Sequence, residues 1–180
     1  CNFKPIQKKP FFTKKSQKRD LVLTIYVKSL YGMIVLARSL RTTKSEASIV
    51  YFVDSTIYET FSKDSQTQEL FQNCGITIIN YGNAPQPIGC VVNYRFIIFC
   101  DILKRHRSKF ERIIIVDGFD TVFQSDPFLQ KWDPNVVYLT SENQMNRVTK
   151  GWYDRLYPHE NVNNVLSSTI INNGVVAAYL

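Results

Sequence analysis

Residues 113–123 read IIIVDGFDTVF, in which four β-branched residues run directly into two carboxylates. This density of Ile and Val is typical of a strand that is buried on both faces, as the strands of parallel sheets are. Charge is costly in such a place unless a partner compensates it. Ligands bind at the carboxyl ends of strands in open α/β sheets, so Asp117 and Asp120 are candidates to hold a cation or a polar ligand. The alternative is an ordinary strand-to-turn junction, in which Asp and Gly serve the turn.

Strand and helix patterns alternate on both sides of this stretch. Apolar β-formers predict strands over 21–27, 47–55, 76–82, 112–117, 136–142 and 169–180. Apolar residues at helical spacing and helix-ending signals predict helices over 31–43, 62–75 and 93–110. This order of elements predicts an α/β protein with a parallel or mixed sheet and helices on both of its faces.

A short helix is expected within SDPFLQKW, residues 125–132. Ser125 or Asp126 would open it, because both residue types cap helix N-termini. Pro127 would be its first residue, where the missing N–H of proline costs nothing.

The positive charge of the chain is concentrated at one end. The net charge is +7, and residues 1–20 hold seven Lys or Arg against one Asp. That segment has no helical or alternating apolar period, so we expect a flexible basic tail or stem over 1–20 and one folded domain over 21–180. The tail could touch phosphate or anionic lipid, and a solvated linker is the simpler interpretation. The nearly neutral domain argues against nucleic acid as a partner.

Several common catalytic and binding motifs are missing from the sequence. There is no GxGxxG after the first predicted strand, no GxxxxGK[ST] and no GxSxG. Two His leave little material for a Ser-His-Asp site, and four Cys show no CxxC pair or zinc-ligand spacing. The carboxylates after the 112–117 strand remain, and Mg²⁺ and Mn²⁺ bind to one or two carboxylates together with substrate phosphates. A metal held in this way would neutralise the charge that builds up on a departing diphosphate.

Arg95 lies in the most apolar of the predicted helices, among Phe96, Ile98, Phe99 and Ile102. A guanidinium in such a place needs an anionic partner. Its planar fork suits a diphosphate, and we expect it to be partly buried and directed toward the carboxyl end of the 112–117 strand. Snorkelling to solvent, or pairing with a structural Asp, is the alternative.

The sequence IIIVDGFDTVFQSDPF is preceded by YRFIIFCDILKRHRSKFER and followed some fifty residues later by IINNGVVA. Together these segments resemble nucleotide-sugar glycosyltransferases of the GT-A class, including the glycogenin-like family eight enzymes, over roughly residues 21–180. The resemblance implies a Rossmann-like GT-A fold with a mostly parallel mixed sheet flanked by helices. It also implies a DxD-type motif at the end of a hydrophobic strand, which binds Mn²⁺ (or Mg²⁺) and the nucleotide diphosphate.

This resemblance assigns roles to individual residues. Asp117 and Asp120 match the metal-binding acids, and Asp117 also contacts the nucleotide-sugar. Two residues separate these acids, where the family motif has one, so the division of labour between them stays open. Arg95 matches an arginine that commonly precedes the DxD strand by about one helix.

Further nucleotide-sugar contacts follow from the same resemblance. Asn172 and Gly174 match the Asn-x-Gly that lines the sugar site on a later strand. A turn or bulge favoured by Asn-Gly is the alternative for Asn172 and Asn173. Thr24 and Tyr26, at the end of the first strand, stand where such folds hold the base and ribose.

The expected activity is therefore metal-dependent transfer of a hexosyl or related sugar from a UDP- or GDP-sugar to a hydroxyl of a glycan, protein or lipid. No catalytic residue can be assigned from the sequence. A sugar-1-phosphate nucleotidyltransferase is the alternative enzyme, but YVKSLYG, residues 26–32, supplies only one Gly and one Lys where those enzymes need a Gly-rich basic loop. A non-catalytic module that binds through its basic tail is the alternative from another class.

The ends of the chain and its location lead to further expectations. The sequence contains no run of 18 apolar residues, so we expect membrane attachment only through an upstream anchor. With such an anchor we expect the protein in the Golgi or ER lumen, and without one in the cytoplasm. The final strand is apolar and ends without a polar exit. We therefore expect it to leave an open sheet edge, and the chain to be the first part of a catalytic domain that is truncated at its C-terminus and has little activity alone.

Overall fold

The computed structural model describes residues 15–26, 30–83, 91–145 and 169–180. The described elements, in chain order, are β1 (Asp20–Tyr26), α1 (Leu30–Thr42), β2 (Ser48–Val53), α2 (Ser55–Lys63), α3 (Ser65–Asn73), β3 (Ile76–Asn80), α4 (Val91–His106), the 3₁₀ turn η2 (Arg107–Lys109), β4 (Arg112–Val116), the 3₁₀ turn η3 (Pro127–Leu129), β5 (Tyr138–Met145) and β6 (Thr169–Tyr179). The predicted strands are confirmed to within a few residues.

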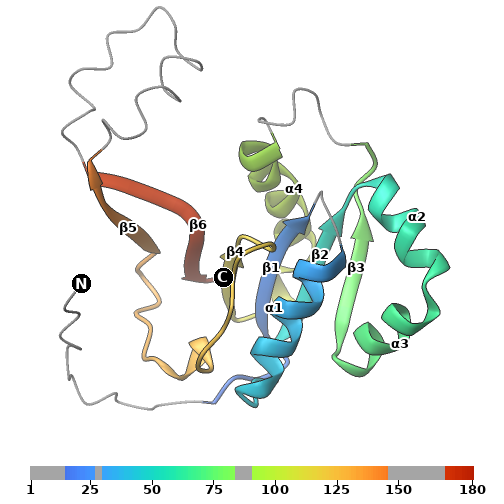
Figure 1. Ribbon diagram of the computed structural model, residues 1–180. Coiled ribbons are helices and arrows are strands. Elements are labelled where there is room, and N and C mark those ends of the chain that lie inside the picture. Colours follow the sequence, from blue (N-terminus) through green and yellow to red (C-terminus); the bar gives the residue numbers. More distant parts are fainter. Residues whose placement is uncertain (1–14, 27–29, 84–90, 146–168) are drawn as a thin grey trace, which may run out of the picture.

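The strands form one mixed sheet of six in the order β3-β2-β1-β4-β6-β5 (Figure 1). The first four run parallel to one another, whereas β6 is antiparallel to β4 and β5 is antiparallel to β6. The α/β class and the mixed sheet flanked by helices are confirmed, and this arrangement is compatible with a Rossmann-like fold. The expectation of an open edge at the final strand is wrong, because β6 lies between β4 and β5.

Two apolar cores cover the two faces of the sheet. On one face α1, α2, α3 and η3 bury alternate strand residues such as Val22, Tyr51 and Ile114. On the other face α4 packs against the intervening residues, and Phe99 lies 5.4 Å from Phe52 between ring centroids. The predicted cover on both faces is therefore present.

The helix predicted over 62–75 corresponds to α3, which starts at Ser65. Helix α2 was not predicted, and only its last two residues fall in that range. The Asp64 carboxylate accepts hydrogen bonds from the backbone N–H of Thr67 at 3.0 Å and from its hydroxyl at 2.6 Å, which caps α3. Asp54 caps α2 in the same way through the N–H of Ile57 at 2.8 Å. The Asp-Ser pairs at 54–55 and 64–65 were the sequence signals for these two helix starts.

Asp126 caps η3 as the sequence predicts, with Pro127 as the first residue of the turn. Its carboxylate accepts hydrogen bonds from the N–H of Phe128 at 3.1 Å and from the N–H of Ser16 at 3.2 Å, and Asp126 is buried. The same carboxylate thus anchors residue 16, which lies within the segment assigned to the tail. Packed structure begins before residue 21, and residues 1–14 of that segment lie outside the described residues.

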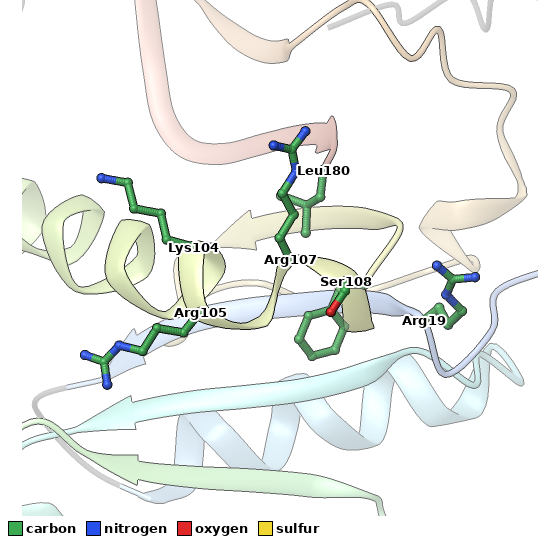
Figure 2. A pocket seen from close by; sticks show the side chains of 7 residues that line it. Arg19, Lys104, Arg105, Arg107, Ser108 and Leu180 are labelled. Atoms are coloured by element: carbon green, nitrogen blue, oxygen red, sulfur yellow. The ribbon is translucent and has the colours of Figure 1, made fainter.

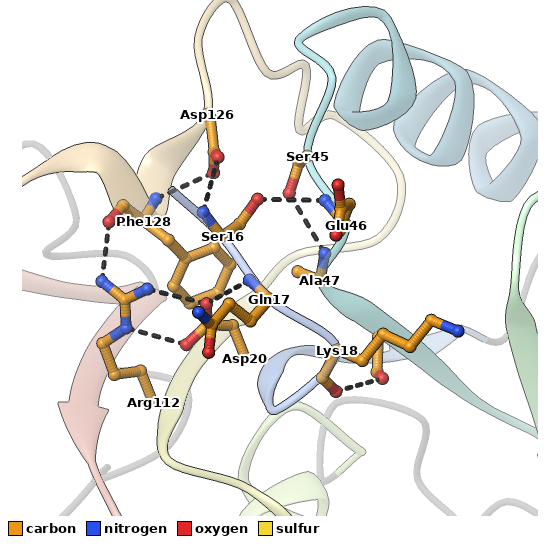
Figure 3. Close-up of polar contacts among 11 residues, drawn as sticks. Ser16, Gln17, Lys18, Asp20, Ser45, Glu46, Ala47, Arg112, Asp126 and Phe128 are labelled. Carbon is orange, nitrogen blue, oxygen red and sulfur yellow. Dashed lines mark hydrogen bonds and ion pairs between the residues drawn. The ribbon is translucent and has the colours of Figure 1, made fainter. Parts of the chain in front are cut away.

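A buried ion pair joins the amino ends of β1 and β4 (Figure 3). The guanidinium of Arg112 donates to both carboxylate oxygens of Asp20 at 2.7 Å and to the carbonyl of Phe128 at 2.6 Å. The N–H of Gln17 donates to the same carboxylate at 2.7 Å. Both charged side chains are less than 5% exposed, at 4% and 2%. Every polar group of the pair therefore needs its partner inside the protein.

A second arginine ties the end of α1 to the loops beside it. The guanidinium of Arg41 donates to the carbonyls of Cys74, Ser45 and Ala47 at 2.8, 2.9 and 2.8 Å. Burial lowers the pKa of Arg41 from its ordinary value, which is high enough that the group stays charged.

No described helix is long and apolar enough to cross a bilayer.

Replacing Arg112 by Met should lower the free energy of unfolding by about 3–5 kcal/mol, because it leaves the Asp20 charge buried without its partner. The measurement is urea unfolding followed by circular dichroism. Arg105→Met, which breaks the exposed ion pair with Asp101, is the control and should change stability little. Equal losses for the two variants would contradict the role of burial.

Candidate functional site

The candidate site lies where the order of the strands reverses. The chain proceeds outward from β1 to β2 and β3 and then crosses to β4 on the opposite side of β1. Because β1 and β4 are parallel neighbours, their carboxyl ends lie side by side at this switch point. Open α/β sheets bind their ligands in the crevice outside such a point. Asp117 is the first residue after β4 and therefore stands at this edge.

Arg95 of α4 forms an ion pair with Asp117, from its Nη1 to Oδ1. The Arg95 side chain is 3% exposed, whereas that of Asp117 is 46% exposed. The guanidinium also lies 5.0 Å from the centre of the Phe96 ring, against which it can stack. The expected burial and direction of Arg95 are confirmed. The arrangement places a positive charge beneath a carboxylate that faces solvent.

Asp117 differs from the other acid that follows a buried strand. Asp54 comes directly after β2, but its carboxylate caps α2. After β4 the chain enters a turn instead of a helix, so Asp117 has no helix to cap. Its backbone N–H donates to the carbonyl of Gly174 at 2.9 Å, which fixes the position of the residue independently of its side chain. A half-exposed carboxylate held at both backbone and side chain is a preorganised ligand group.

Asp120 lies in the turn after Asp117 and is exposed. The neighbouring Phe119 is 62% exposed. The third acid of the motif region, Asp126, serves the η3 cap and is buried. Within the described ranges no group of three or more His, Cys, Asp or Glu is arranged to hold a metal. The carboxylates of Asp117 and Asp120 remain the candidates to hold a metal at this edge.

The Asn-Gly segment of β6 reaches the same site. Thr140 of β5 pairs with Asn172, but the preceding Leu139 pairs with Val176, so β6 contains an irregularity between these partners. The strand bends sharply in Figure 1. This irregularity is compatible with the turn or bulge that the Asn-Gly pair suggests as an alternative, and it includes Gly174, whose carbonyl accepts from Asp117. Bulges often re-aim a strand next to functional sites.

The two residues predicted on β1 have different placements. Thr24 is fully buried, and its hydroxyl is 3.4 Å from the carbonyl of Ile25. Tyr26 is the last residue of β1, at the edge shared with Asp117. The structure thus brings Arg95, Asp117 and the backbone of Gly174 into contact, and it keeps the Thr24 side chain in the interior.

The hydrogen bond from the Asp117 N–H to the Gly174 carbonyl is a feature of the site that the sequence does not predict. No residue pattern predicts such a bond, because the bond depends on β6 being antiparallel to β4. Comparisons with known proteins add no identification: no protein-family model matches the chain, and no curated protein shows significant similarity to it.

Replacing Asp117 by Asn should destabilise the protein by about 1–3 kcal/mol, because the buried guanidinium of Arg95 loses its ion-pair partner. Asp120→Asn removes the same charge from an exposed position and should leave stability nearly unchanged. Thermal and urea unfolding of the two variants beside the wild type measure this difference. Equal stability of both variants would show that the ion pair contributes nothing.

Proposed function

We propose that the chain carries the nucleotide-sugar site of a metal-dependent glycosyltransferase with a GT-A type fold. The observation that carries the proposal is the half-exposed Asp117 carboxylate at the strand switch point, supported from below by the buried Arg95. The substrate is a UDP- or GDP-sugar, and the acceptor is a hydroxyl on a glycan, protein or lipid. The combination of a parallel β3-β2-β1-β4 unit with an antiparallel β6 supports the fold assignment.

The available donor groups fit Mn²⁺ or Mg²⁺. Asp117 and Asp120 offer hard carboxylate oxygens, and both face solvent at least in part. Such ions bind to one or two carboxylates and complete their coordination with water and phosphate oxygens. When bound, the metal would supply charge neutralisation for the departing nucleoside diphosphate.

Arg95 acts through Asp117 in this proposal. Its guanidinium is buried and already paired with that carboxylate, so its role is to position Asp117. The pairing with Asp117 replaces the expectation that Arg95 binds the diphosphate directly. The Gly174 carbonyl fixes the backbone of the same residue from the opposite strand.

The remaining assignments concern the organic part of the donor. Tyr26, at the end of β1, is assigned to the base and ribose, and Thr24 supports that strand from the interior. Asn172, next to the bulge in β6, is assigned to the sugar together with Gly174.

The connection between β1 and α1 favours a transferase over a sugar-1-phosphate nucleotidyltransferase. Strand β1 ends at Tyr26 and α1 begins at Leu30, so only residues 27–29 join them. The sequence over this connection, YVKSLYG at residues 26–32, holds only one Gly and one Lys, where a nucleotidyltransferase needs a Gly-rich basic loop. The alternative of a binding module that uses the basic tail depends on residues 1–14, which lie outside the described residues.

Isothermal titration calorimetry of UDP and GDP, with Mn²⁺ and with EDTA, tests the proposal. Wild-type protein should bind one of the two nucleotides with Mn²⁺, and EDTA should weaken that binding. Asp120→Asn should reduce the Mn²⁺-dependent part by about tenfold or more, because one of two charged metal ligands is lost while the fold is unaffected.

Glu59→Gln on the exposed side of α2 provides a control with the same loss of charge and should bind as the wild type does. Nucleotide binding that needs no metal and survives Asp120→Asn would contradict the metal site. Absence of binding to both nucleotides would contradict the proposed donor class.

A further inference from the structure

A basic pocket lies at the amino ends of the parallel strands, whereas Asp117 lies at their carboxyl ends. It has a volume of about 530 Å³ and is lined by Arg19, Lys104, Arg105, Arg107, Ser108, Phe110 and Leu180 (Figure 2). Arg19 immediately precedes β1, and Ser108 and Phe110 precede β4, so the pocket opens at the amino ends of these strands. A ligand here would not compete with one bound at the carboxyl ends.

The cations of this pocket are only partly neutralised. Arg105 is ion-paired with Asp101 on α4. Arg19, Lys104 and Arg107 are exposed and form no ion pair with another described residue. Some of this charge stabilises the carboxyl end of α4 through the helix dipole. Arg19 belongs to a different segment, so the helix dipole does not explain why it joins the cluster.

An apolar groove continues from the basic pocket along α4. It has a volume of about 300 Å³, and its walls include Phe96, Phe99, Cys100 and Leu103 of α4 and Ile115 of β4. The groove and the basic pocket share Lys104, Arg107 and Leu180. Figure 2 shows Arg107 beside Leu180 at this junction. The two hollows are therefore one surface with a cationic end and an apolar end.

We propose that this surface binds a lipid with an anionic phosphate headgroup. The phosphate lies among Arg19, Lys104 and Arg107, whose donors suit phosphate oxygens, and the Ser108 hydroxyl is an additional donor. An acyl or prenyl chain lies in the groove beside Phe96 and Leu103. A surface with a cationic end and an apolar end matches the headgroup and the chain of an amphiphile. Nucleic acid would instead need further cations along the groove.

The proposal uses none of the residues assigned to the nucleotide-sugar site. Its basic pocket lies at the amino ends of the parallel strands, and its groove extends along α4 as far as Phe96, which lies against Arg95. Headgroup and chain must both contribute, since a small phosphate alone leaves the groove unfilled and a neutral lipid leaves the cations without a partner. Binding should also weaken with salt, because exposed charges are screened.

The test is calorimetry with the whole chain and three soluble probes: dioctanoyl phosphatidic acid below its micellar concentration, dioctanoyl phosphatidylcholine and glycerol 3-phosphate. Phosphatidic acid should bind about tenfold or more tightly than either of the others, since removing the chain or the net charge removes one part of the interaction. Equal binding of phosphatidic acid and phosphatidylcholine would refute the headgroup site, and equal binding of glycerol 3-phosphate would refute the groove.

Two variants locate the binding. Lys104→Gln with Arg107→Gln should weaken phosphatidic acid binding by about tenfold or more, as expected for the loss of two cations near an anionic lipid. Cys100→Trp, which fills the groove from its exposed wall, should weaken binding without a change of charge. Lys63→Gln with Lys131→Gln, at exposed positions elsewhere, is the matched control and should bind as the wild type does.

Sedimentation with phosphatidylcholine vesicles, with and without phosphatidic acid, then tests whether the lipid is recognised in a bilayer. Binding only to vesicles that contain phosphatidic acid is expected. A wild type that self-associates through the groove, and becomes monomeric in Cys100→Trp, would instead assign the groove to a second copy of the chain and overturn the proposal.

Discussion

The Asp20–Arg112 ion pair sets the register of the sheet at its centre. These residues are direct partners in the β1–β4 ladder, and their side chains form a bidentate pair that is almost completely buried. Phe128 and Trp132 lie against the guanidinium, with 5.1 and 5.6 Å from its carbon to the ring centres. Such a pair adds little net stability compared with apolar residues, but a slip by one residue would separate two charges inside the core. The pair therefore fixes where β4 ends relative to β1, and with it the position of Asp117.

The two arginine–aspartate pairs of the sheet illustrate opposite uses of the same chemistry. Arg112 and Asp20 are both buried, and the carboxylate uses both of its oxygens. In the pair of Arg95 with Asp117 only the cation is buried, and the carboxylate remains half exposed. Burial of the cation strengthens its attraction to the Asp117 carboxylate, because little water screens it there. The result is an anionic group that is both held in place and open to a ligand, which a fully buried pair is not.

Local sequence signals predicted the fold well where local forces decide the structure. Strands such as 112–116 and the Asp126 cap follow from burial patterns and capping chemistry, and both are confirmed. The helix predicted over 62–75 corresponds to α3, whereas α2, which begins at the Asp-Ser pair at 54–55, was not predicted. The contacts of Asp20 with Arg112, 92 residues later, and of Gly174 with Asp117 depend on strand order, which no local pattern encodes.

The candidate site was predictable only in part for the same reason. The sequence predicted the position of Asp117 at the end of β4 and the direction of Arg95, but it left open whether the arginine would face a ligand or an aspartate. For the Asn-Gly segment it left a sugar site and a turn or bulge as alternatives, and the structure shows a register irregularity in β6 there. Thr24 was chosen from its position at the end of a strand, yet the two-residue period of β1 turns its side chain into the core, on the same face as Val22.

The long separation of Asp20 from Arg112 also has a consequence for synthesis of the chain on the ribosome. At about 5–20 residues per second, roughly 5–20 seconds pass between the emergence of the aspartate and that of its partner. Until α4 follows, late in this same interval, β1, β2 and β3 can pair with one another while Leu21, Leu23, Val50 and Phe52 lack the cover of α4 on their second face. The nascent sheet therefore exposes a broad apolar surface, and at its growing edge β1 has no neighbour. Early folding of this protein is a period in which chaperones have a defined surface to protect.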